Sequence, residues 1–297
     1  MAKRRRVPGA PPWIAAASAV AVIGLALGLA TAAGYVRWEP RPQTAVGPSR
    51  TSQPPLAPRI VPTPVPPPSP VQPPRPQPVG RAAIIFDDAG GSLEDLEEII
   101  ALGRPVTVAV LPGLRYSRQV AERARTAGLE VFLHLPLEPE DPGKALGPGG
   151  ITVAMADAEI ERSVRASLAS MPGVVGVNNH MGSKGTADPR VMRAVLRVVK
   201  ERHLLFVDSV TSPRTVAGQM AAEMGIRVAS RQIFLDNEDD AAAIRAQLRR
   251  LIALARTRGD AVAIGHAQRL TAQVLGEMLG EFDSAGIELV PASLLAR

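Results

Sequence analysis

Two adjacent carboxylates, Asp87 and Asp88, are the first residues of the chain whose type and position suggest chemistry. They follow an apolar run, residues 82–86, which is predicted to be a buried strand, and two glycines then let the chain turn. Carboxylates a few ångströms apart resist joint ionisation, and a divalent cation removes that difficulty. On this motif alone a second interpretation stays open, in which one Asp caps a helix that begins near Ser92.

Further polar side chains stand at the ends of other apolar runs. Three of the four histidines are among them, namely His134, His180 and His266. The same positions hold Glu138, Asn178, Asn179, Asp208 and Asp236. A lone histidine is more often a hydrogen-bonded structural group than a ligand, but neutral imidazoles with one carboxylate are a usual ligand set for catalytic Zn²⁺. Together these residues favour a metal site.

The elements that must position these residues alternate regularly from residue 81 onward. Strands are expected at residues 82–86, 106–111, 130–135, 174–177, 204–207, 227–229, 261–264 and 288–290. Helices are expected at residues 92–102, 117–127, 157–170, 188–202, 213–224, 239–258 and 271–285. The alternation predicts a mostly parallel α/β sheet with about enough units to close a barrel. Active sites of parallel barrels gather at the carboxyl ends of the strands, where the polar residues stand.

The charge of the chain is unevenly distributed. The formal net charge is +6, but residues 1–80 hold nine of the 34 basic residues and one of the 28 acidic ones. The rest of the chain is therefore close to neutral. It lacks the basic footprint of a nucleic-acid binder, and we expect no nucleic-acid partner.

The first 36 residues have the pattern of a membrane signal-anchor. Residues 1–12 carry a basic cluster that favours a cytoplasmic end, and residues 13–36 are apolar enough to cross a bilayer as a helix. A cleaved signal peptide is the alternative, because small residues at 30–33 resemble a cleavage site. An uncleaved segment predicts a single-pass protein of the inner (cytoplasmic) membrane with its main domain outside the cytoplasm. The absence of Cys is compatible with an oxidising compartment.

Residues 37–80 are rich in proline and are expected to form a disordered, extended linker. Proline fixes φ and removes an N–H donor, so helices and central strands are excluded. A polyproline-like chain rises about 3.1 Å per residue, so this segment could reach on the order of 100 Å from the membrane. A passive tether is the default interpretation, and a Pro-rich protein ligand is the alternative.

Six short motifs recur in the order of a known family. They are FDDAG (86–90), LHLPLEP (133–139), GVNNHMGSK (176–184), FVDS (206–209), FLD (234–236) and IGH (264–266). They resemble the divergent polysaccharide deacetylase family, distant relatives of the NodB-type carbohydrate esterases. The resemblance covers nearly all of residues 81–297 and implies a distorted (β/α) barrel of about seven parallel strands.

The resemblance also implies roles for single residues. In the wider NodB group the first Asp of the pair is the base and the second binds metal, which carries over to Asp87 and Asp88. His134 and His180 would be the other ligands of a divalent metal, Zn by expectation, and His266 would protonate the leaving amine. The remaining candidates, which would orient these groups or contact substrate hydroxyls, are Glu138, Asn178, Asn179, Asp208 and Asp236.

The chain also departs from the pattern of its relatives. It lacks the two histidines on one short segment that usually ligate metal in NodB proteins, so the two imidazoles come from separate strands. Val210 and Gln232 stand where this family tends to carry Arg and Asp, and Ala267 stands where it often has Pro.

These observations lead to one expected function and two alternatives. The expected function is membrane-tethered, metal-dependent removal of acetyl groups from a cell-envelope polysaccharide. The first alternative is a non-catalytic envelope protein that binds a glycan or a partner on a deacetylase-like barrel. The second is hydrolysis of another ester or amide with the same residues.

Overall fold

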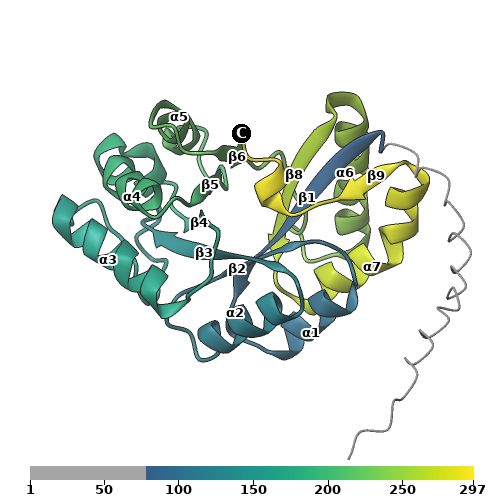
Figure 1. The fold of residues 1–297 in the computed structure, drawn as a ribbon, viewed down its shortest axis with the longest axis horizontal. Coiled ribbons are helices and arrows are strands. Elements are labelled where there is room, and N and C mark those ends of the chain that lie inside the picture. Colours follow the sequence, from purple (N-terminus) through teal and green to yellow (C-terminus); the bar gives the residue numbers. More distant parts are fainter. Residues whose placement is uncertain (1–77) are drawn as a thin grey trace, which may run out of the picture. The chain divides into compact units, whose positions relative to one another are not determined.

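The computed structural model describes residues 78–297, and their centre is a curled sheet of parallel strands (Figure 1). The strands are β1 (Gly80–Ala89), β2 (Thr107–Val110), β3 (Glu130–Leu137), β4 (Gly176–Met181), β5 (Leu205–Asp208), β6 (Val228–Ser230), β7 (Ile233–Phe234), β8 (Asp260–His266) and β9 (Ile287–Leu289). Their order is β6-β5-β4-β3-β2-β1-β8-β7, with β9 beside β1, and each pairing is parallel. The two ends of this row, β6 and β7, are consecutive in the chain, with only Arg231 and Gln232 between them. The sheet is thus a curled half-barrel, which confirms the parallel α/β architecture.

Helices cover the convex face of the sheet (Figure 1). They are α1 (Glu94–Ala101), α2 (Ser117–Thr126), α3 (Asp157–Ser170), α4 (Pro189–Glu201), α5 (Ala217–Glu223), α6 (Ala241–Arg258) and α7 (Arg269–Ser284), with short 3₁₀ turns η1 (Gly185–Ala187) and η2 (Ala292–Leu294). Asp188 caps α4 by accepting from two backbone N–H groups, and Pro189 follows it at the first helical position. Gly259 ends α6 in the left-handed conformation, with φ 85°.

The core has two layers because strand side chains alternate between faces. On β1, Ala82, Ile84 and Phe86 pack outward against the helices, whereas Ala83 and Ile85 face the inside of the curl. The inside is filled at the amino ends of the strands by the C-terminal segment, whose buried residues are Val290, Ala292, Leu295 and Ala296. The apolar filling leaves the carboxyl ends of the strands for polar inward-facing side chains.

Each of the eight expected strands is present, but several have other bounds than expected. β1, β4 and β8 continue to Ala89, Met181 and His266, so the polar residues expected after these strands lie within them. β7 has no counterpart in the sequence-based expectation, because a strand of two residues carries no readable alternation. β3 continues through Pro136 to Leu137, so His134 lies inside the strand and not near its end. The helix expected from residue 213 begins at Ala217, because Ser212 and Thr215 form turns before it.

The predicted cytoplasmic end (1–12), the membrane segment (13–36) and nearly all of the predicted linker (37–80) lie outside the described residues. β1 begins at Gly80, one residue before the domain boundary expected at 81. Among residues 78–297, none of the helices combines the length and the apolarity that a bilayer crossing requires.

Candidate functional site

The alternation of the strands aims a set of polar side chains into the concave side of the sheet. On β1 the inward positions Ala83 and Ile85 are followed by Asp87. The same alternation on the other strands gives the inward positions His134 on β3, Asn178 and His180 on β4, Ser209 after β5 and His266 on β8. Parallel strands present their carboxyl ends at one edge, so residues far apart in sequence meet there.

Asp88 reaches this site through an irregularity in β1. The register of β1 against β2 shifts between Phe86 and Ala89, and Asp88 has a positive φ of 61°. Asp tolerates the left-handed region better than most residues. The irregularity turns the Asp88 side chain to the inner side, where strict alternation would point it outward.

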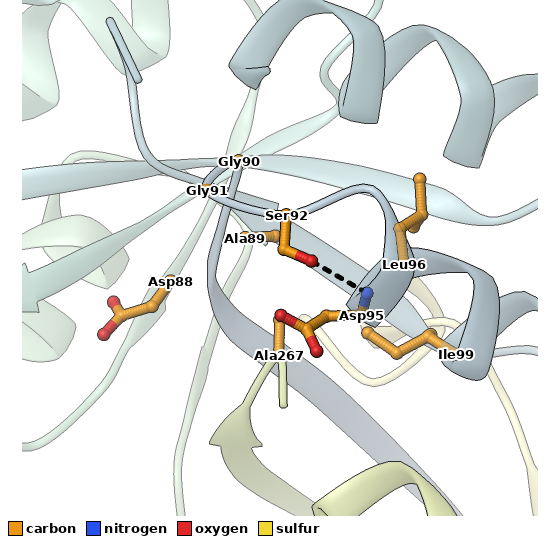
Figure 2. Close-up of a pocket in the computed structure, with 9 residues that line it drawn as sticks. All are labelled: Asp88, Ala89, Gly90, Gly91, Ser92, Asp95, Leu96, Ile99 and Ala267. Carbon is orange, nitrogen blue, oxygen red and sulfur yellow. Dashed lines mark hydrogen bonds between the residues drawn. The ribbon is translucent and has the colours of Figure 1, made fainter. Parts of the chain in front are cut away.

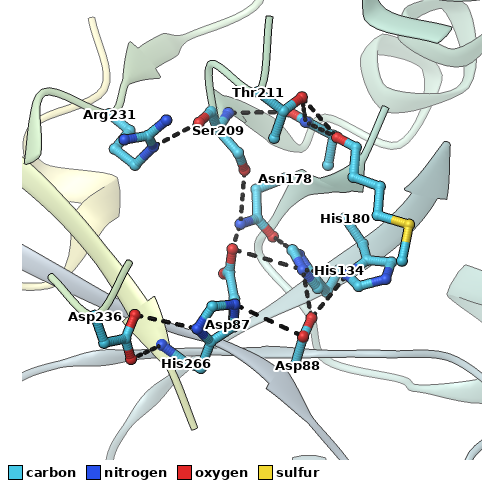
Figure 3. Close-up of polar contacts among 12 residues, drawn as sticks. Asp87, Asp88, His134, Asn178, His180, Ser209, Thr211, Arg231, Asp236 and His266 are labelled. Carbon is cyan, nitrogen blue, oxygen red and sulfur yellow. Dashed lines mark hydrogen bonds and ion pairs between the residues drawn. The ribbon is translucent and has the colours of Figure 1, made fainter. Parts of the chain in front are cut away.

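Three ligand-type side chains then converge (Figure 3). Asp88 Oδ1 lies 2.7 Å from His180 Nδ1 and 3.1 Å from His134 Nε2. The two imidazole nitrogens lie 3.3 Å apart. One ligand atom from each of the three residues lies within 4.8 Å of those of the other two. The structure thus brings together the three residues predicted to bind metal.

The donor set fits a divalent cation. Asp88 Oδ1 is a buried oxygen without a hydrogen-bond partner of acceptable geometry among the described residues, although two ring nitrogens stand beside it. A carboxylate oxygen and two ring nitrogens that crowd one point are the arrangement expected of ligands that await an ion. Burial alone would raise the pKa of Asp88, but the adjacent His134 and His180 outweigh it and hold that pKa far below its usual range. The carboxylate is therefore charged, as a metal ligand must be.

Asn178 connects two of the central groups. Its side-chain Nδ2 donates to Asp87 Oδ1 at 2.8 Å, which leaves its Oδ1 to accept from His134 Nδ1 at 2.9 Å. A proton on Nδ1 leaves the Nε2 lone pair of neutral His134 facing Asp88 and His180. Asn178 is fully buried, so this bridge fixes both the tautomer and the orientation of His134.

Replacing Asn178 with Ala is expected to weaken Zn²⁺ binding by about 10- to 100-fold, the range found when a partner that orients a ligand is removed. Competition of the protein with a calibrated chelator measures this affinity. Ser209→Ala is the matched control, because Ser209 Oγ contacts Asn178 Nδ2 at 3.3 Å without touching His134. An Asn178→Ala protein that binds Zn²⁺ as tightly as Ser209→Ala would show that the bridge does not orient the ligand.

Asp87 is the buried carboxylate of the pair, with 5% of its surface exposed. Burial raises the pKa of Asp87 to about 6, against the opposing effects of His134 and Asn178. Its Oδ2 lies 3.5 Å from His134 Nε2 and so faces the three-residue cluster. A carboxylate with a pKa near neutrality is suited to accept a proton at physiological pH.

His266 stands on the open side of the cluster, with 39% of its side chain exposed. Asp236 Oδ1 lies 3.1 Å from His266 Nδ1, and Asp236 Oδ2 accepts from the His266 backbone N–H at 2.7 Å. The hydrogen bond to Asp236 raises the pKa of His266 above its usual value, although burial opposes this. Its free Nε2 lies 3.9 Å from Asp88 Oδ2, so a protonated His266 presents an N–H toward the site.

Asp236→Asn is expected to lower the pKa of His266, because the variant removes the negative charge that stabilises the imidazolium. An NMR titration of the His266 ring would follow the change. Asp240→Asn is the control, since Asp240 caps α6 in the same loop through Ala243 N. An unchanged His266 titration in the Asp236 variant would contradict the assignment of this pair.

Three of the predicted residues have contacts that stabilise the surrounding loops. Glu138 forms an ion pair of 2.6 Å with Lys184 and accepts from Val153 N. Asp208 accepts from Thr215 Oγ1 and from two backbone N–H groups, as a turn residue does. Asn179 accepts from Ser209 N and donates to Met181 O, which ties the end of β4 to the loop after β5. These three side chains contact loop atoms and not the cluster. Asn178, in contrast, contacts Asp87 and His134, and Asp236 contacts His266.

Sequence reasoning missed Arg231. The side chain lies between β6 and β7 and donates from Nε to Ser209 O at 2.6 Å and from Nη2 to Val210 O at 2.7 Å. The available signal was a single arginine between two short apolar runs in a sheet-forming stretch. Val210, whose carbonyl accepts from Arg231, has a φ of 48°, which is uncommon for a β-branched residue. The hydrogen bond from Arg231 helps to stabilise this backbone conformation.

A small cavity adjoins the cluster on the side of the β1–α1 loop (Figure 2). It measures about 100 Å³ and is lined by Asp88, Gly90, Asp95, Leu96 and Ala267 among others. Ser92 Oγ accepts from Asp95 N at 3.1 Å and holds the turn that forms its wall.

Several known proteins are similar to this chain in sequence or in fold. The profile described as divergent polysaccharide deacetylase matches residues 84–296. The uncharacterized protein YibQ of Escherichia coli is 38% identical over 216 residues, which cover 73% of this chain and 67% of that protein. An uncharacterized protein of Haemophilus influenzae is 36% identical over 195 residues, which cover 66% of this chain and 69% of the relative. The crystal structure of an uncharacterized protein from Agrobacterium tumefaciens has a TM-score of 0.69 at 26% identity, covering 73% of this chain and 89% of the other.

Proposed function

The chain belongs to the divergent polysaccharide deacetylase family, and from this premise we propose that it is a metal-dependent hydrolase that removes acetyl groups from a cell-envelope polysaccharide. The observation that carries the proposal is the convergence of Asp88, His134 and His180 around a buried oxygen without a hydrogen-bond partner in the described part of the chain. A candidate base, Asp87, and a candidate acid, His266, flank this cluster on two sides.

The proposed reaction assigns one step to each flanking residue. A divalent cation held by Asp88, His134 and His180 would polarise the acyl carbonyl and lower the pKa of water. Asp87 accepts the proton of the attacking water at Oδ2, because its Oδ1 is already held by Asn178. His266 is held by Asp236 through Nδ1, so its Nε2 gives a proton to the leaving amine.

The test is acetate release by the purified full-length chain, loaded with Zn²⁺, from a partly acetylated oligosaccharide. We expect release that stops when a chelator removes the metal and returns when Zn²⁺ is restored. If the protein binds the oligosaccharide but releases no acetate under any metal condition, it is a glycan-binding member of the family and the hydrolase proposal is wrong.

We also propose that the protein is anchored in the inner membrane, with the hydrolase domain outside the cytoplasm. Support comes from the sequence alone, namely the basic cluster before the apolar residues 13–36 and the proline-rich stretch that follows. Protease added to spheroplasts would digest the domain if this orientation is right and would leave it intact if the domain faces the cytoplasm.

A further inference from the structure

Among the half-buried arginines of residues 78–297, Arg231 is distinguished by the lack of an acidic partner within this part of the chain. Five further half-buried arginines in residues 78–297 each have a carboxylate within 4.0 Å, namely Arg81, Arg104, Arg165, Arg190 and Arg245. Arg231 has none within that distance among these residues, and the segment before residue 78 contains a single acidic side chain, Glu39. A cation that is partly removed from water without a counter-ion is unusual and calls for an explanation.

The guanidinium is held rigidly at the edge of the site. It uses two of its five N–H donors on the carbonyls of Ser209 and Val210, at 2.6 and 2.7 Å. Its Cζ lies over the Phe234 ring, 4.9 Å from the ring centre, and that ring meets the His266 ring edge to face, with the ring centres 5.4 Å apart. Figure 3 shows Arg231 beside Ser209, in the polar network that leads through Asn178 to Asp87.

The charge of Arg231 is therefore only weakly compensated. Burial lowers the pKa of Arg231, and Asp87 and Asp208 oppose this at longer range than an ion pair. The remaining N–H donors point from a fixed plane, which is the geometry that recognises a carboxylate. A solvated surface arginine does not hold its N–H donors in a fixed plane, and ordering its side chain on binding costs conformational entropy.

We propose that Arg231 binds a carboxylate of the substrate, so that the site selects an acidic glycan in which an acetylated amino sugar neighbours a sugar that carries a carboxylate. This inference rests on the proposed function for the acetyl group but concerns binding alone. Two sources share the chemistry: a ring carboxylate, as in a uronic acid, and a carboxylate on a lactyl ether, as in muramic acid.

The test compares acids with their own methyl esters, which keep the shape and lose the charge. The ligands are two tetrasaccharides, one alternating N-acetylglucosamine with glucuronic acid and the other alternating it with N-acetylmuramic acid, each as free acid and as ester. Calorimetry with the chelator-treated full-length chain measures binding without turnover, so the result does not depend on catalysis. We expect at least one acid to bind roughly tenfold or more tightly than its ester, since a hydrogen bond to a charged group contributes that much.

The variants attribute this preference to one side chain. Arg231→Met should make the dissociation constants of acid and ester equal. Arg231→Lys should keep only part of the difference, because an ammonium cannot form the two parallel hydrogen bonds. Arg190→Met is the matched control: Arg190 is also half-buried and also donates to two backbone carbonyls, those of Val153 and Met155, but it has Asp157 as its partner. The control should retain the wild-type ratio.

The outcomes separate this inference from the proposed function. The pair of ligands that shows the preference for the acid identifies the source of the carboxylate. Higher salt should reduce this preference, because it screens the charges. Equal binding of acid and ester by the wild-type chain for both pairs would overturn the inference, as would a ratio that survives in Arg231→Met. If acetate is released from neutral and acidic glycans with the same kcat/KM, the protein is a hydrolase but Arg231 does not bind a carboxylate of the substrate.

Discussion

Replacing Asp88 with Ala is expected to leave a folded protein that no longer retains a divalent cation and releases acetate at least about a thousandfold more slowly. Asp88 supplies the carboxylate of the cluster, and two neutral imidazoles alone bind Zn²⁺ poorly. Loss of the several kcal/mol that a metal contributes to transition-state stabilisation corresponds to such a factor. Metal content per chain and the rate of acetate release are the two measurements.

The control for this variant lies in the first turn of the helix that follows, α1. Asp95 is a partly exposed carboxylate seven positions later that lines the adjacent cavity and takes no part in the cluster. Asp95→Ala should therefore keep its metal. An Asp88→Ala protein that binds one Zn²⁺ per chain as tightly as Asp95→Ala would remove Asp88 from the ligand set.

Asp87→Asn is expected to lower kcat/KM by about 10²- to 10⁴-fold, the usual contribution of a general base, while the bound metal stays. Asn has nearly the same shape and can still accept from Asn178 Nδ2, but it cannot take a proton from water. Activity and metal content measured on the same preparation separate this residue from its neighbour Asp88. Loss of both together would make Asp87 a ligand and not a base.

The same variant should also be more stable than the wild-type chain in the absence of metal. Because burial raises the pKa of Asp87 from 3.8 to about 6, the folded protein resists the charged form. The wild-type chain therefore loses stability as the pH rises from about 4 through 6, and Asn does not titrate. Urea unfolding at pH 8 should favour the variant by up to about 3 kcal/mol, and the difference should vanish below about pH 4.

Much of the fold was predictable because the chain follows simple periodic rules. Apolar runs of three to six residues separated by amphipathic helices identified each strand except β7. The two-residue β7 depends on pairing with β8, a long-range contact that no local pattern reports. The inward direction of His134 and His266 follows from strand alternation once the strands are located.

Other parts of the site could not be derived from local patterns. Asp88 turns inward only because its backbone adopts a positive φ, which the sequence does not reveal. Asp208 follows an apolar run as Asp87 does, yet it points to the turn before α5, since the alternation of side chains along β5 places it on the outer face. Its position in the sequence does not distinguish a residue of the site from a turn residue, and the hydrogen bond from Thr215 Oγ1 shows that it stabilises the turn.

The proposed hydrolysis depends on Asp88, His134 and His180 binding one divalent cation, and anomalous diffraction at the zinc edge from Zn²⁺-soaked crystals would locate that ion. We expect one strong peak within about 2.0–2.2 Å of Asp88 Oδ1, His134 Nε2 and His180 Nδ1. A peak elsewhere, or no peak while Asp88 and His180 remain in direct contact, would contradict it.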